Sequence, residues 1–307
     1  MSIRALRSPA KHENSDVKER RRQPGEGNEA WLRRVLGETG LVETKPEWSL
    51  LLLVGGQDPL SFRLRVAQSH VRDDLTPSAW SHVAFVPALA PSLGESPTRE
   101  VSLAPAACFG ESGFPVPTNG LQQGRLAPYL EAEAFPNIAL LSVPVATERI
   151  GNTLDRLRRQ RTLLDVPQLI LRWLAYGWGV GVPGSPLAEG LGIPAAAVLE
   201  VAFAAQGFDL TPGLESRSSC PEAIWQAARW WHEFYAQTYR RPADPPRPVP
   251  PPGQPTRQAP APVLEAIKGA YTALHNLVPE RPAAEPATPP TASAPAAGAR
   301  ASRRRGR

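Results

Sequence analysis

Proline and tryptophan occupy different parts of this 307-residue chain, and their separation limits how much of it can fold. All eight Trp lie between residues 30 and 240, whereas 16 of the 36 Pro lie beyond residue 240. Because proline fixes φ and removes a backbone donor, residues 241–262, which read RPADPPRPVPPPGQPTRQAPAP, suit neither a helix nor a sheet. The sequence therefore predicts one folded domain at 30–240, followed by a proline-rich linker at 241–262.

Three further segments flank this domain. Residues 1–29 form a charged arm and residues 280–307 an Ala, Pro and Arg-rich basic tail, and we expect both to be disordered. Between linker and tail, residues 263–279 are predicted to form an amphipathic helix, because apolar side chains recur there at steps of three and four. This helix would dock either on the folded domain or on a partner, and the sequence leaves both alternatives open.

The net charge of +5 at first suggests an anionic partner. However, residues 30–240 carry 17 basic and 20 acidic groups, a balance of −3, so the excess positive charge belongs to the two ends of the chain. We expect no specific nucleic-acid binding by the folded domain. The N-terminal arm has no apolar leader, and the longest apolar run, 50–54, is far short of a transmembrane helix, so we expect a cytoplasmic protein.

The pattern of apolar residues predicts an α+β fold in which strands come first and helices dominate the second half. Strands are expected at 48–54, 80–86, 99–103 and 137–143. Helices are expected at 29–38, 59–69, 147–160, 166–176, 195–206 and 221–239.

Sequence motifs for cofactors and metals are lacking. The run from Gly179 to Gly184 matches GxGxxG, but it follows a predicted helix rather than a strand, which favours a plain loop. There is no phosphate-binding loop, no HExxH and no CxxC pair, so we expect neither a cofactor nor a metal.

The residue most suited to chemistry is Cys220, at the start of the predicted helix 221–239. Pro221 fits the first helical position, since its missing N–H would be unpaired there. A thiol at a helix start faces free N–H groups and the positive end of the helix dipole, which favour the thiolate and could stabilise an oxyanion. The sequence therefore predicts a lowered pKa for Cys220.

A thiolate nucleophile needs an imidazole as general base, and His82 is the best mounted candidate because it lies in a predicted strand. Glu100 opens the next predicted strand, which would pair with that of His82 as a hairpin. We therefore expect Glu100 to lie beside the imidazole and to orient it. Inert packing roles for Cys220 and His82, and a solvated role for Glu100, are the simpler alternatives.

Several stretches resemble the circularly permuted papain-like amidases, the YaeF/YiiX-like relatives of NlpC-type cysteine peptidases; lecithin retinol acyltransferase is similar. The segment Trp80-Ser-His-Val-Ala-Phe-Val86 resembles their SHVGIV strand, and Cys220-Pro-Glu-Ala-Ile224 resembles their CSEL/FV motif. The resemblance implies a papain-like antiparallel sheet packed against helices over roughly residues 48–235. It also implies that Cys220 is the nucleophile, His82 the base and Glu100 the third polar residue.

These expectations give two functional hypotheses. In the first, the protein is a cysteine-dependent hydrolase or acyltransferase that cleaves an amide or ester, with peptide, peptidoglycan-fragment or lipid acyl substrates implied by the resemblance. In the second, it is a catalytically inactive papain-like adaptor or interaction protein. The environment of Cys220 discriminates between them, because only an enzyme needs an accessible thiolate.

Overall fold

The structure is a computed structural model. It describes residues 22–39, 47–104, 118–181, 184–240 and 274–276, and only the backbone in 232–240 and 274–276. The predicted linker 241–262 and basic tail 280–307 lie outside the described residues, as do residues 1–21 of the charged arm. All described residues belong to one compact unit, Met1–Leu277.

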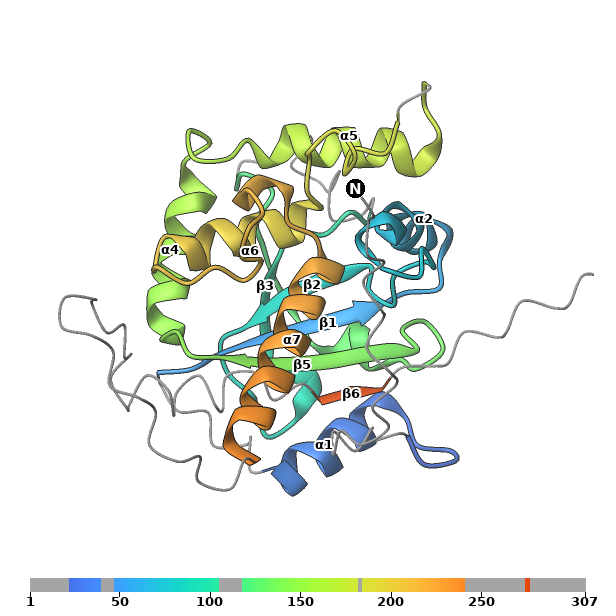
Figure 1. The fold of residues 1–307 in the computed structure, drawn as a ribbon, viewed down its shortest axis with the longest axis vertical. Coiled ribbons are helices and arrows are strands. Elements are labelled where there is room, and N and C mark those ends of the chain that lie inside the picture. Colours follow the sequence, from blue (N-terminus) through green and yellow to red (C-terminus); the bar gives the residue numbers. More distant parts are fainter. Residues whose placement is uncertain (1–21, 40–46, 105–117, 182–183, 241–273, 277–307) are drawn as a thin grey trace, which may run out of the picture. The chain divides into compact units, whose positions relative to one another are not determined.

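An antiparallel sheet forms the centre of this unit, in the order β4-β3-β2-β1-β5-β6 (Figure 1). Every residue of β1 and of β5 is buried, which explains why both strands read as continuous apolar runs. The expected α+β class, with an antiparallel sheet packed against helices, is confirmed. The strands are β1 (Ser49–Gly55), β2 (His82–Val86), β3 (Pro97–Glu100), β4 (Gln122–Arg125), β5 (Asn137–Val143) and β6 (Leu274–Asn276).

The register of β1 with β2 assigns each side chain to one of two faces. Leu53 pairs with Val83, and both belong to the larger apolar core. Val54 pairs with His82, and Val54 belongs to a second, separate core. Because directly paired residues point to the same side of a sheet, His82 lies on the face of the second core.

Each face of the sheet is covered by different helices. The larger core includes side chains from α4 (Thr147–Arg159), α5 (Val166–Trp178), α6 (Pro194–Ala204) and α7 (Pro221–Arg240). The second core is closed by α1 (Asn28–Thr39), through Trp31 and Leu32 among others. The remaining helix, α2 (Pro59–Ala67), begins at Asp58, whose carboxylate accepts hydrogen bonds from two backbone N–H groups. In the figure, α1 lies apart from α4 and α6 (Figure 1).

The observed elements differ from the expected ones in three places. Strand β3 spans 97–100 instead of 99–103, and β4 was not expected because its sequence, QQGR, is polar. In the predicted helix 263–279 only residues 274–276 are described, and they form strand β6 rather than a helix. We attribute this correction to the edge of β5, whose backbone groups pair with Leu274–Asn276.

Candidate functional site

Three side chains that are distant in sequence, His82, Glu100 and Tyr129, form a hydrogen-bonded network. His82 Nε2 lies 2.6 Å from Glu100 Oε2, and the Tyr129 hydroxyl donates to the same oxygen. The other carboxylate oxygen of Glu100 accepts a bond from Thr98 Oγ1 at 2.9 Å. The predicted placement of Glu100 beside His82 is therefore confirmed, because the β2–β3 pairing turns both side chains to the same face.

The network keeps Glu100 ionised although it is buried. Burial raises the pKa of Glu100, but hydrogen bonds from His82, Tyr129 and Thr98, together with the charge of His82, outweigh it and lower the pKa. Burial, reinforced by the Glu100 carboxylate, raises the pKa of Tyr129. Tyr129 therefore remains a hydrogen-bond donor at neutral pH.

The network is packed tightly on its own side of the sheet. The Tyr129 ring stacks on the His82 imidazole with 5.6 Å between ring centroids, and Tyr129 also packs on the second core. A Cβ at Gly124 would lie 2.6 Å from Glu100 Oε1, so the strand β4 approaches the carboxylate closely only because position 124 carries no side chain. These contacts hold β2, β3 and the turn Ala127–Leu130 together through one hydrogen-bonded network.

Cys220 is found at the start of α7, as expected, but its environment differs from the expected one. The residue is only 1% exposed and belongs to the larger core. Burial raises its pKa to about 12, although the N–H groups of Ala223 and Glu222 act in the opposite direction. The predicted lowering of the Cys220 pKa is therefore wrong, because desolvation outweighs the helix start.

The structure does not bring Cys220 and His82 together. Cys220 packs in the core that contains Val83, whereas His82 pairs with Val54 and stacks on Tyr129 on the other face. The sheet itself therefore separates the thiol from the imidazole. Of the three predicted site residues, two are joined and the proposed nucleophile is apart from both.

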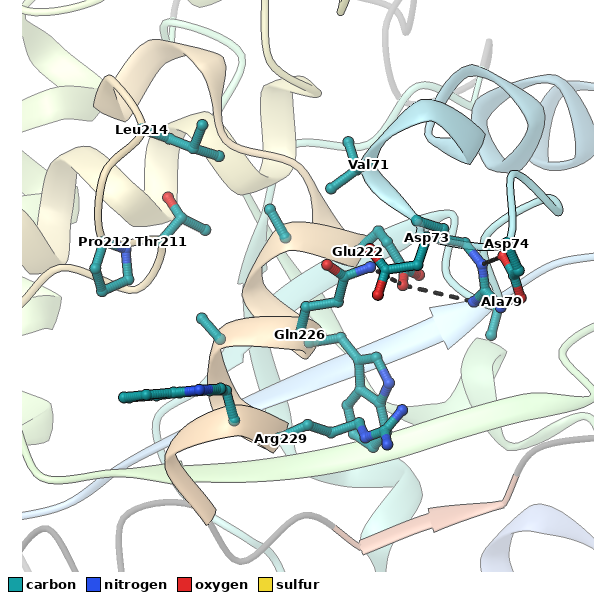
Figure 2. A pocket seen from close by; sticks show the side chains of 15 residues that line it. Val71, Asp73, Asp74, Ala79, Thr211, Pro212, Leu214, Glu222, Gln226 and Arg229 are labelled. Atoms are coloured by element: carbon teal, nitrogen blue, oxygen red, sulfur yellow. Dashed lines mark hydrogen bonds and ion pairs between the residues drawn. The ribbon is translucent and has the colours of Figure 1, made fainter. Parts of the chain in front are cut away.

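A groove opens beside the first turns of α7, with a volume of about 680 Å³. In Figure 2, Glu222, Gln226 and Arg229 project from α7 into the region between two loops. One loop contributes residues 71–74 and Ala79, and the other contributes Thr211, Pro212 and Leu214 (Figure 2). Cys220, one turn earlier, is not among the residues that line the groove.

The floor of the groove is polar and ordered. Glu222 is buried, and its carboxylate accepts bonds from Ser78 Oγ at 2.6 Å and Gln226 Nε2 at 2.9 Å. Arg72 lies 3.5 Å from the same carboxylate and also binds Asp74 through two hydrogen bonds. Arg72 therefore ties the loop at one side of the groove to α7.

The rim of the groove carries exposed apolar groups. Trp230 on α7 is 56% exposed, and Leu214 is about equally accessible. The loop that carries Leu214 is anchored by the buried Glu200, which accepts bonds from Leu210 N at 3.1 Å and Thr211 Oγ1 at 2.8 Å. A preformed depression in which large apolar side chains lie beside a few ordered polar groups is a candidate site for a ligand or a peptide.

A scan against protein-family models and searches of curated proteins and of solved structures found no match to this chain. Among the described residues no group of three or more His, Cys, Asp or Glu could hold a metal ion. No helix in the described part of the chain is both long and apolar enough to cross a bilayer.

The groove was not predicted from the sequence, although α7 carries a signal for it. Ile224, Trp225, Ala228 and Trp231 share the apolar face of this helix, and Trp230 falls outside it. The position of Trp230 outside the apolar face is the one feature of the α7 sequence that points toward the groove. Tyr129 had no comparable signal, because it belongs to a short turn outside the predicted elements.

Proposed function

We propose that this chain is a non-enzymatic interaction protein that binds a peptide segment in the groove beside α7. The observation that carries the proposal is the position of Cys220, buried at the start of α7 and on the opposite face of the sheet from His82. A nucleophilic thiol must reach both a base and a substrate, and Cys220 has neither in reach.

The cysteine hydrolase or acyltransferase hypothesis retains one supporting feature, the backbone N–H groups of Glu222 and Ala223 beside the Cys220 thiol at the start of α7. A permuted papain-like fold likewise stays a prediction, supported by an antiparallel sheet with a cysteine-bearing helix packed on it. The separation of Cys220 from His82 favours the inactive form of that hypothesis.

The groove supports peptide binding through its rim, where Trp230 and Leu214 are exposed to a partner. Beneath them the buried Glu222 carboxylate is held by Arg72 and Ser78. Tryptophan is among the residues that contribute most to affinity at protein–protein contacts.

The proposal is tested by alkylation of native protein with iodoacetamide at neutral pH, followed peptide by peptide by mass spectrometry. We expect Cys220 to remain unmodified over a period in which the urea-unfolded chain is fully modified at the same residue, because a buried thiol of raised pKa reacts slowly. Rapid alkylation of Cys220 in the native protein would contradict the proposal and restore the hydrolase hypothesis.

A further inference from the structure

We infer that the proline-rich segment 241–262 of this chain is the peptide that occupies the groove beside α7. This inference rests on the proposed function and names the ligand of the same site. The segment follows α7 directly, and α7 contributes a wall of the groove (Figure 2).

The exposed indole on the rim of the groove suits a proline-rich ligand. Proline-rich segments bind to surfaces with exposed aromatic side chains, because the extended polyproline conformation loses little entropy when its rings pack on an indole. Trp230 is 56% exposed and lines the groove. It packs edge-on against Trp231 with 4.6 Å between ring centroids, so its indole is held by its neighbour.

The charges of the groove and of the proline-rich segment are opposite in sign. Three acidic side chains line the groove, Asp73, Asp74 and Glu222, against two basic ones, Arg72 and Arg229, and Arg72 is engaged by Asp74. Residues 241–262 contain three arginines and one aspartate, a balance of +2. The segment therefore complements the groove, where Asp73 and Asp74 are both exposed.

The segment is long enough to reach the groove from the end of α7. Trp230 precedes the end of α7 by ten residues, which corresponds to about 15 Å along the helix axis. Residues 241–257 can span about 50 Å in an extended polyproline conformation. The segment can therefore turn back along α7 to the groove, and its tethering makes its effective concentration high.

Trypsin tests the inference on the full chain. Proline follows both Arg241 and Arg247, so Arg257–Gln258 is the bond in this segment that trypsin cleaves. We expect this bond to be cleaved roughly five-fold more slowly in the intact protein than in a synthetic peptide of residues 241–262, since cleavage follows the undocked population. Equal rates in the protein and the peptide would overturn the inference.

Variants show whether the groove causes the protection. Trp230→Ala and Asp73→Arg are each expected to raise the rate of cleavage at Arg257–Gln258 toward that of the free peptide. The matched control is Trp178→Ala, because Trp178 is 51% exposed but lies at the end of α5 and does not line the groove. Protection that survives both groove variants would contradict the inference.

The same assay distinguishes the remaining occupants. Protection that appears only as protein concentration rises would show that the segment of a second copy enters the groove, and the inference of binding within one chain would then fail. None of these outcomes changes the alkylation of Cys220, so failure of this inference and failure of the proposed function can be told apart.

Discussion

At the scale of single residues, two buried carboxylates have pKa values that are shifted in opposite directions by their surroundings. Glu100 is surrounded by three donors that lower its pKa. Glu200 has Leu210 N and Thr211 Oγ1 as partners, but burial dominates and raises its pKa. The two groups therefore give opposite dependences of stability on pH.

For Glu100 we predict a loss of stability on replacement by alanine. Glu100→Ala leaves His82, Thr98 and the Tyr129 hydroxyl without their shared acceptor, which should lower the free energy of unfolding by about 2–3 kcal/mol at pH 7. Urea denaturation measures this, with Glu95→Ala as control, since Glu95 is exposed and its pairing with Arg125 contributes little. Equal effects of the two substitutions would contradict a structural role for the network.

For Glu200 we predict a gain at high pH. A raised folded-state pKa means that the folded chain holds the proton more tightly than the unfolded chain, so stability falls as pH rises through the folded pKa. Glu200→Gln keeps an acceptor for Leu210 N, presents an amide donor to Thr211 Oγ1 and removes that fall, so we expect its stability relative to wild type to be greater at pH 8 than at pH 4. Parallel stability curves for the two proteins between pH 4 and pH 8 would refute the raised pKa.

At the scale of elements, the start of α7 is positioned by a close contact with the start of α6. Gly192 N donates to Arg217 O at 2.7 Å and Ile193 N to Ser219 O at 3.0 Å. A Cβ at Gly192 would lie 2.3 Å from Ser219 O, which is backbone and cannot move aside alone. This contact fixes the turn that carries Cys220 and hence the wall of the groove.

We therefore predict that Gly192→Ala lowers stability by about 2 kcal/mol or more, because the α6 and α7 starts must separate. The same substitution at Gly37, an exposed position inside α1 with nothing within 4 Å, should raise stability by about 0.5–1 kcal/mol. Thermal unfolding of both variants measures the contrast. Tolerance of alanine at position 192 would mean that the two helix starts are not held as described.

Apolar sequence patterns predicted the central strands of the sheet but not its edge strands. The runs at 50–54 and 137–143 are apolar throughout, and the sequence located both strands because central strands are buried on two faces. Strand β4 escaped prediction because an edge strand of polar residues has no apolar period. Strand β6 escaped because residues 264–278 have helical spacing, and pairing with β5 overrides this local preference.

At the scale of the whole molecule, the partition of side chains between two cores places His82 and Cys220 on opposite faces of the sheet. His82 and Val83 point to opposite sides of the sheet, as neighbouring residues of a strand do. The sequence could not indicate which side α7 covers, because that depends on contacts between segments more than a hundred residues apart. The Glu100–His82 contact could be predicted from the sequence because it forms between two neighbouring strands. The predicted Cys220–His82 contact depends on distant segments, and the structure does not contain it.

The dependence of Cys220 alkylation on pH and on His82 reports whether the thiol and the imidazole act together. At each pH from 6 to 9, Cys220 should be alkylated slowly and at the same rate in wild type and in His82→Ala. The thiol is buried, its pKa is raised to about 12 and the sheet separates it from the imidazole. A fast rate that levels off near neutral pH in wild type and falls in His82→Ala would show that the two residues act together, and would contradict the account.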